Sequence, residues 1–198
     1  MRRLNSFGFW LWFPLLLLGI LTWGAATAQG QAKEPEKPAA PDRLKDLDNP
    51  KGEIKVELTV DREDATYKVG DQIVFTFRTN KDCRLTLFNV GTSGKVHVLF
   101  PNEHHKDNLV KAGTVYRIPP EGAKFVFKAQ GPAGEDVVKA IATLENVPLV
   151  NEANLKPAGP FQEVGKPEKD IVIGIQSALK PVDFKKWAEA EKVIKIVE

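Results

Sequence analysis

The stretch that decides the fold is CRLTLFNVGTSGKVHVLF, residues 83–100. It contains two apolar runs that alternate with a two-residue period, which is typical of β-strands. The residues between them, Gly91 to Gly94, form a good hairpin turn. Phe88 and Leu99 make both runs apolar on their second face as well. We therefore expect two adjacent central strands that are covered on both sides.

The same alternation extends outward from Ile54 to Leu144, broken by turns rich in Gly, Pro, Asn and Asp. The expected strands cover residues 53–60, 73–78, 83–90, 95–100, 114–118, 124–129 and 136–144. No alternation of strands and helices is present, which argues against a parallel sheet. The pattern predicts an all-β protein, an immunoglobulin-like antiparallel β-sandwich of about seven to nine strands with a short C-terminal helix.

The C-terminal part of the chain is harder to assign. Residues 146–169 are loop-like, and Ile171, Ile173 and Ile175 alternate as in an eighth strand over residues 170–176. From Pro181 onward, helical and strand patterns compete. We predict a short helix over 182–188 and a closing strand over 192–197.

The N-terminus is typical of an export signal. Arg2 and Arg3 precede an apolar run, and Ala26-Thr27-Ala28 supplies a small-x-small cleavage site. The alternative is an uncleaved anchor helix, because the run approaches the length that spans a bilayer. Residues 1–28 are predicted to be a signal peptide of the Sec type, and the mature chain to be periplasmic or extracellular without stable membrane insertion.

A linker is predicted for residues 29–52, which combine four prolines with ten charged residues of mixed sign. The β-sandwich domain is predicted to cover residues 53–198, with a core over 53–145 and a C-terminal extension over 146–198. Without the two arginines of the signal, 26 basic residues balance 26 acidic ones. A neutral mature chain has no global field that would steer it onto nucleic acid.

Cys83 is the only cysteine, so no intrachain disulfide can form. Its place in an apolar strand favours a buried side chain. A reactive or intermolecular thiol is the alternative.

The densest group of potential ligands lies in the loop 101–108. Imidazole groups there suit a transition metal, and carboxylate and amide oxygens suit calcium. Adjacent histidines in an extended segment point to opposite sides, however, and Asn and Asp in loops often bind nearby backbone groups. We therefore predict a binding site without a metal, formed by Asn102, His104, His105, Asp107 and Asn108.

No catalytic motif is visible in the sequence. Ser93 lies in a hairpin turn and Ser177 follows an expected strand, and neither stands in a G-x-S-x-G elbow. Phosphate-binding and dinucleotide-binding glycine motifs are missing too. The sequence predicts a protein that is not an enzyme and needs no cofactor.

Several short motifs occur in a characteristic order. They are YKVGDQIVF at 67–75, LTLFNV at 85–90, GKV at 94–96, LFPN at 99–102, DN at 107–108, GPAG at 131–134 and VKAI at 138–141. In this order they resemble the bacterial "domain of unknown function 4384" family. The resemblance implies an exported, immunoglobulin-like module of unassigned activity, with no agreed catalytic residues. The motifs can equally encode fold rather than function.

The sequence favours an exported, non-enzymatic β-sandwich that binds another envelope protein or a surface polymer. The loop 102–108 or an exposed sheet edge would supply the contact. The alternative is a small-ligand or metal-binding domain that uses the loop 101–108.

Overall fold

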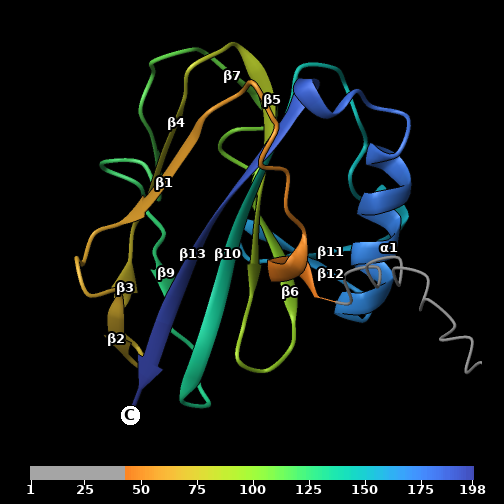
Figure 1. Ribbon diagram of the computed structural model, residues 1–198. Coiled ribbons are helices and arrows are strands. Elements are labelled where there is room, and N and C mark those ends of the chain that lie inside the picture. Colours follow the sequence, from red (N-terminus) through yellow and green to blue (C-terminus); the bar gives the residue numbers. More distant parts are fainter. Residues whose placement is uncertain (1–42) are drawn as a thin grey trace, which may run out of the picture. The chain divides into compact units, whose positions relative to one another are not determined.

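The computed structural model describes residues 43–198 (Figure 1). The predicted signal peptide and residues 29–42 of the predicted linker lie outside this range. The strands are β1 (Val56–Val60), β2 (Thr66–Lys68), β3 (Gln72–Ile73), β4 (Phe75–Thr79), β5 (Cys83–Val90), β6 (Val96–Phe100), β7 (Leu109–Val110), β8 (Tyr116–Ile118), β9 (Phe127–Lys128), β10 (Gly134–Thr143), β11 (Leu155–Ala158), β12 (Phe161–Val164) and β13 (Trp187–Val197). The helical elements are α1 (Glu168–Leu179) and the 3₁₀ turns η1 (Leu44–Asp46), η2 (Glu152–Asn154) and η3 (Phe184–Lys186).

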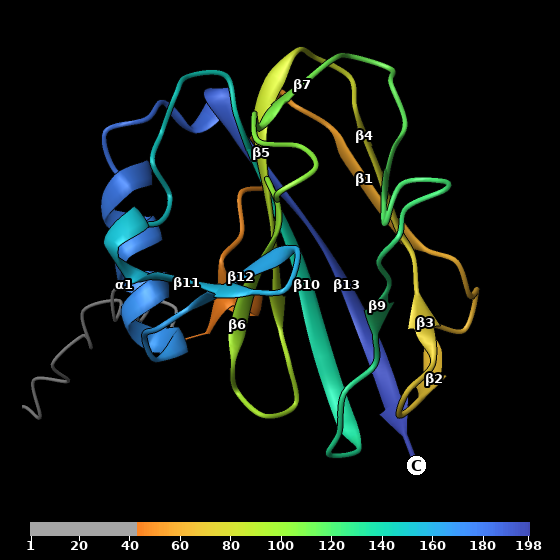
Figure 2. The ribbon, with the colours of Figure 1, turned by 180° about the vertical axis from the view of Figure 1, so that it is seen from behind.

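The main sheet has the strand order β11-β12-β6-β5-β10-β13-β2, and β7 also pairs with β5. Adjacent strands of this sheet are antiparallel, except that β13 and β2 run parallel to each other. A small sheet, β1-β4-β8, and the pair β3-β9 cover one face of the main sheet (Figures 1 and 2). The all-β sandwich is confirmed, and β5 and β6 form the predicted hairpin.

Aromatic rings fill the core between the main sheet and the smaller ones. Phe77 packs edge-on against Phe100 at 5.3 Å between ring centroids and stacks on Tyr116 at the same distance. Phe75 contacts Phe127 in a similar edge-on arrangement at 5.1 Å. Cys83 is buried in this core, as its strand pattern predicts. Burial raises the pKa of its thiol and favours the unreactive neutral form.

A second core lies on the other face of the main sheet, where α1 packs. The predicted strand over 170–176 is wrong, because this segment forms α1. Its buried residues are spaced as on one helical face and are Ile171, Val172, Ile175 and Leu179. Ile173, which completed the apparent alternation, is 48% exposed. Pro167 precedes the helix, and Glu168 and Asp170 lie in its first turn, where acidic groups are favourable.

The folded domain begins earlier than residue 53. Leu44 and Leu47 are buried in the second core, and the Leu44 backbone N–H donates to Glu168 Oε1 of α1 at 2.8 Å. Asn49 Nδ2 donates to the carbonyl oxygens of Phe184 and Trp187, both at 2.7 Å. The predicted linker is therefore corrected at its C-terminal end, because residues 43–52 belong to the domain.

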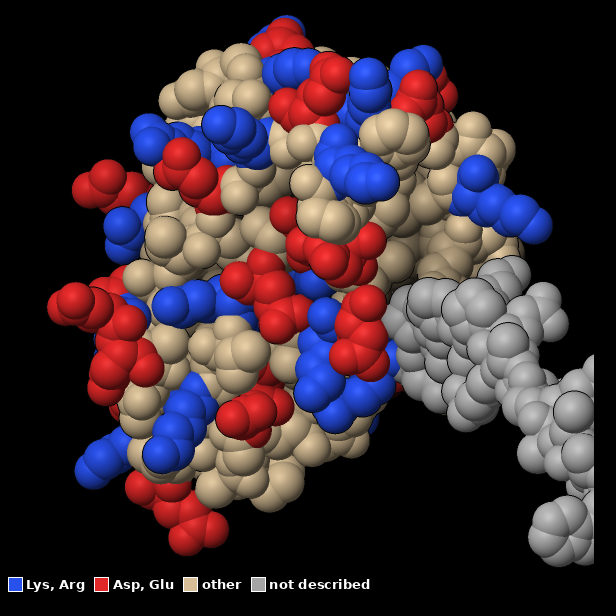
Figure 3. Space-filling view, viewed as in Figure 1, with Lys and Arg blue, Asp and Glu red and all other residues tan. Residues whose placement is uncertain are grey.

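The C-terminal segment closes the main sheet. The predicted helix over 182–188 is reduced to the turn η3, and the closing strand begins at Trp187 rather than Lys192. It pairs with β10 over ten residues. Figure 3 shows acidic and basic side chains interspersed over the side that carries β13 and β10, in keeping with the 28 basic and 26 acidic residues of the sequence. Within residues 43–198, no helix has the length and apolar character that a membrane span requires.

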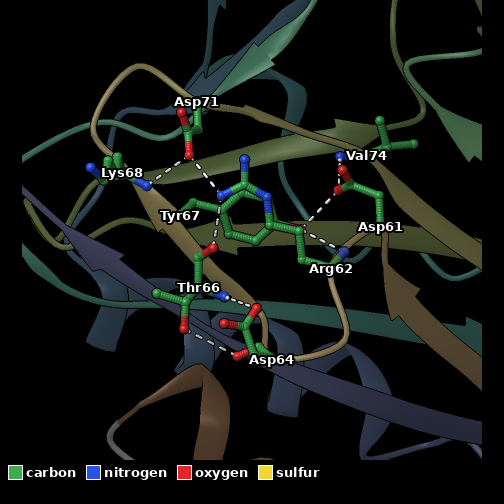
Figure 4. Close-up of polar contacts among 8 residues, drawn as sticks. All are labelled: Asp61, Arg62, Asp64, Thr66, Tyr67, Lys68, Asp71 and Val74. Carbon is green, nitrogen blue, oxygen red and sulfur yellow. Dashed lines mark hydrogen bonds and ion pairs between the residues drawn. The ribbon is translucent and has the colours of Figure 1, made fainter.

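A polar clamp holds β2 at the edge of the main sheet (Figure 4). The hydroxyl of the buried Tyr67 donates to Asp61 Oδ1 at 2.8 Å, and burial together with this bond raises the pKa of Tyr67. The Arg62 guanidinium lies over the Tyr67 ring, 4.5 Å from its centroid. Its Nη1 donates to Asp71 Oδ2 at 2.7 Å and to the Thr66 carbonyl oxygen at 2.9 Å. The motif at 67–75 thus has a structural function.

Gly52 tests the contact between residues 43–52 and β13, and Gly174 of α1 is the control. A Cβ on Gly52 would collide with the Trp187 carbonyl oxygen and crowd Ala188, so Gly52→Ala is expected to cost roughly 2 kcal/mol of unfolding free energy. A Cβ on Gly174 in α1 meets nothing within 4 Å, and Gly174→Ala should add about 0.5–1 kcal/mol. Urea denaturation measures both. A neutral Gly52→Ala would contradict the close packing at this position.

Candidate functional site

The predicted site loop, residues 101–108, connects β6 to β7. Asn102 is 6% exposed, and its side chain binds the loop itself. Its Nδ2 donates to the Leu99 carbonyl oxygen at 2.8 Å, and its Oδ1 accepts from the backbone N–H groups of His104 and His105, both at 3.0 Å. Asn102 therefore shapes the loop.

The two predicted histidines contact different aromatic rings. His104 stacks on Phe125 with 4.5 Å between ring centroids, and His105 lies 5.9 Å from the ring of Phe100. Among residues 43–198, no group of three or more His, Cys, Asp or Glu side chains is placed to hold a metal ion. The contacts of the two histidines are with the protein's own aromatic core.

Arg84 of β5 binds the side chains of both Asp107 and Asn108. Arg84 Nη1 donates to Asn108 Oδ1 at 2.8 Å and to Asp107 Oδ1 at 3.3 Å. Asp107 Oδ1 also accepts from the Leu109 backbone N–H at 3.1 Å. These bonds fix the C-terminal half of the loop.

An open groove of about 1260 Å³ lies beside this loop. Asn102, Asp107 and Asn108 line it, whereas His104 and His105 are not among its lining residues. The residues of the opposite wall belong to the predicted C-terminal extension. They are Asn146, Val147, Pro148, Leu149, Val150, Asn151, Glu152, Leu155, Pro157, Phe161, Gln162 and Gly174.

A second hollow, an inter-sheet cleft of about 350 Å³, opens at one end of the sandwich between its two layers. Asn89 of β5, His97 of β6 and Asp136 of β10 line it. These strands are neighbours, and Asn89 pairs directly with His97 in the register. On each strand the polar residue lies in line with the apolar residues that face the core between the sheets. Because side chains alternate along a strand, the three polar side chains point to the same side of the main sheet.

The walls of the inter-sheet cleft come from two other regions of the chain. Val126 and Phe127 lie at β9, and Pro160 and Phe161 belong to the β11–β12 hairpin. The rings of Phe127 and Phe161 meet edge-on at 5.6 Å. Phe161 also lines the groove and therefore contributes to both hollows.

Asp136 is the most deeply buried charged group of this cleft, at 3% exposure. Its Oδ1 accepts from the Thr92 backbone N–H at 2.8 Å and its Oδ2 from Asn89 Nδ2 at 3.3 Å. Burial raises the pKa of Asp136, and the two hydrogen bonds oppose that shift. Burial also lowers the pKa of His97. Its Nε2 lies 3.9 Å from Glu163 Oε2.

Asn89, His97 and Asp136 are not among the site residues that the sequence predicts. A signal was present in the alternation. Leu85 and Leu87 lead to Asn89, and Val138, Ala140 and Ala142 run back to Asp136. A polar residue at the inward end of each of two adjacent strands indicates a shared polar site.

The fold and its hollows define a β-sandwich module with a helix on one face and an open cleft between its layers. The sequence model of the family described as "Domain of unknown function (DUF4384)" matches residues 66–146, which confirms the resemblance predicted from the motifs. No curated protein and no solved structure matches the chain significantly. Most residues of the cleft fall within the matched stretch, whereas Ala158, Pro160 and Phe161 follow it.

Proposed function

We propose that this chain is an exported, non-enzymatic interaction module that binds an extended segment of another envelope protein. The groove beside the loop 101–108 supports this proposal most strongly. The signal peptide predicted from residues 1–28 would bring the module to the periplasm or the cell exterior.

The chemistry of the groove suits a polypeptide. Val147, Val150 and Leu155 are partly buried against the second core and provide an aliphatic wall. Side-chain amides on both walls of the groove can form hydrogen bonds with the backbone N–H and C=O groups of an extended strand. The volume of about 1260 Å³ also exceeds the roughly 300–1000 Å³ usual for small-molecule pockets.

The charges of the groove have mixed sign, which argues against a highly charged polymer as the partner. Arg84 and Lys106 are basic, whereas Glu103, Asp107 and Glu152 are acidic. Charged groups of both signs favour a particular register of a mixed-charge peptide.

The loop that borders the groove is held in place before any partner arrives. Besides the bonds of Asn102 and Arg84, the Glu103 backbone N–H donates to the Pro160 carbonyl oxygen at 3.2 Å. A preformed wall reduces the ordering entropy that binding must overcome.

An exposed sheet edge is a weaker candidate for the contact. β11 forms one edge of the main sheet, and Pro157 in its middle has no N–H group for an added strand. Proline at an edge strand is a device that discourages strand addition.

Selection from a library of random twelve-residue peptides on the exported chain tests the groove. We expect enriched peptides whose affinity falls at least ten-fold in Val150→Glu and changes in Glu152→Arg, because both side chains line the groove. Val115→Glu makes the same substitution at a loop position that is 60% exposed and should leave the affinity unchanged.

Thermal melting of each variant shows whether the fold is retained, and Glu152→Arg is exposed enough to spare it. Failure to enrich any peptide would overturn the proposal. Equal binding by all three variants would place the contact elsewhere, and binding of an oligosaccharide but no peptide would favour a surface polymer.

A further inference from the structure

The inter-sheet cleft contains a carboxylate whose immediate partners are uncharged. The donors to Asp136 are the Thr92 backbone N–H and the Asn89 side-chain amide. His97 is the nearest titratable side chain, and burial lowers its pKa, which disfavours a positive charge there. A carboxylate at 3% exposure is costly to desolvate unless a positive charge compensates it.

Basic side chains of the protein are poorly suited to supply that charge. Lys95 Nζ is bound to Glu163 Oε2 at 3.0 Å. Lys128 lines the cleft but is exposed, as is Gln130 beside it. The compensating charge would therefore come from outside the protein.

The walls of the cleft favour a cation with an apolar part. Phe127 and Phe161 meet edge-on at 5.6 Å, and Val126 and Pro160 extend the apolar surface. Aromatic faces attract organic cations, most strongly where water is excluded. The volume of about 350 Å³ lies at the small end of the range for ligand pockets, roughly 300–1000 Å³.

We infer that the inter-sheet cleft binds a small organic cation, whose protonated amine meets the Asp136 carboxylate and whose hydrocarbon part lies against Phe127 and Phe161. This site is separate from the peptide groove, although Phe161 contributes to both. The inference does not depend on the groove having a partner.

Three probes with the same ring and different charge test the site: benzylamine, benzyl alcohol and benzoate. Isothermal titration of the exported chain should show benzylamine binding at least ten-fold more tightly than the other two. Asp136→Asn should weaken benzylamine at least ten-fold. The control Asp48→Asn removes the same charge at an exposed position that lines neither hollow, and it should leave the affinity unchanged.

A wall variant keeps the test decisive if Asp136→Asn does not fold. Phe127→Leu keeps a partly buried apolar side chain but removes the aromatic face, and it should weaken benzylamine several-fold. Equal affinity for the three probes would overturn the inference, as would unchanged binding in Asp136→Asn or no binding of benzylamine at 10 mM. Tighter binding of methyl glucoside than of benzylamine would instead assign the cleft to a neutral hydroxyl-rich ligand.

Discussion

Leu44→Ala is expected to lower the free energy of unfolding by about 3 kcal/mol, the usual cost of a large-to-small change in a core. Leu44 is completely buried in the second core, although the sequence around it has the composition of a linker. Its backbone N–H is also bound to Glu168, so the methyl groups cannot simply withdraw from the core. Urea denaturation of residues 29–198, followed by circular dichroism and by the fluorescence of Trp187, the single tryptophan of this range, measures the loss.

The matched control is Leu109→Ala in β7, where the leucine is 42% exposed. That variant should change the unfolding free energy by no more than about 0.5 kcal/mol. A Leu44→Ala variant as stable as the control would show that residues 43–52 are not part of the cooperative fold.

The strands could be predicted because alternation records which face of a strand is buried. The predicted bounds of β5, β6 and β10 agree with the observed strands to within two residues. A one-residue shift would turn every side chain of a strand to the wrong face, so the apolar pattern defines the strand closely. The same rule failed at α1, where Ile171, Ile173 and Ile175 alternate by coincidence. Only the burial of Val172 and Leu179 reveals the helical face, and that burial depends on the tertiary packing.

The candidate sites also combine parts that the local sequence can predict with parts that depend on the tertiary fold. The loop 101–108 could be proposed as a candidate because its polar residues are consecutive, and three of the five predicted residues line a groove. The opposite wall comes from residues 146–162, whose position cannot be read from local composition. The inter-sheet cleft depends on strand register and on a hairpin about 25 residues beyond Asp136, so its parts are local in space but distant in sequence.

The family motifs carry two different kinds of information. Tyr67 and Asp71 of the first motif belong to the clamp that holds β2, which is a structural function. Asn89 of the LTLFNV motif and Gly131 of the GPAG motif line the inter-sheet cleft instead. The hypothesis that the motifs encode fold applies to the first set, and the second set lines the cleft for which we infer binding.

Lys139→Met is expected to lower the free energy of unfolding by about 3 kcal/mol, because it leaves carboxylates without their counter-charge in a poorly hydrated place. Lys139 lies between apolar residues of β10, and its side chain is 3% exposed. Its Nζ lies 2.5 Å from Glu189 Oε2 and 3.3 Å from Glu191 Oε2 on β13. Residues 43–52 contribute the burial, since the Lys45 carbonyl oxygen accepts from the same Nζ at 3.5 Å.

A double-mutant cycle separates the ion pair from the packing of the lysine side chain. Glu189→Gln added to Lys139→Met should recover at least about 1 kcal/mol, because the uncompensated charge is removed. Lys111→Met breaks an ion pair with Asp82 in which both side chains are more than half exposed, and solvent screening should make its effect undetectable. If Lys139→Met were neutral and Glu189→Gln gave no recovery, the methylene stem of Lys139 rather than its charge would stabilise this face. In that case β10 would tolerate any long apolar residue at position 139.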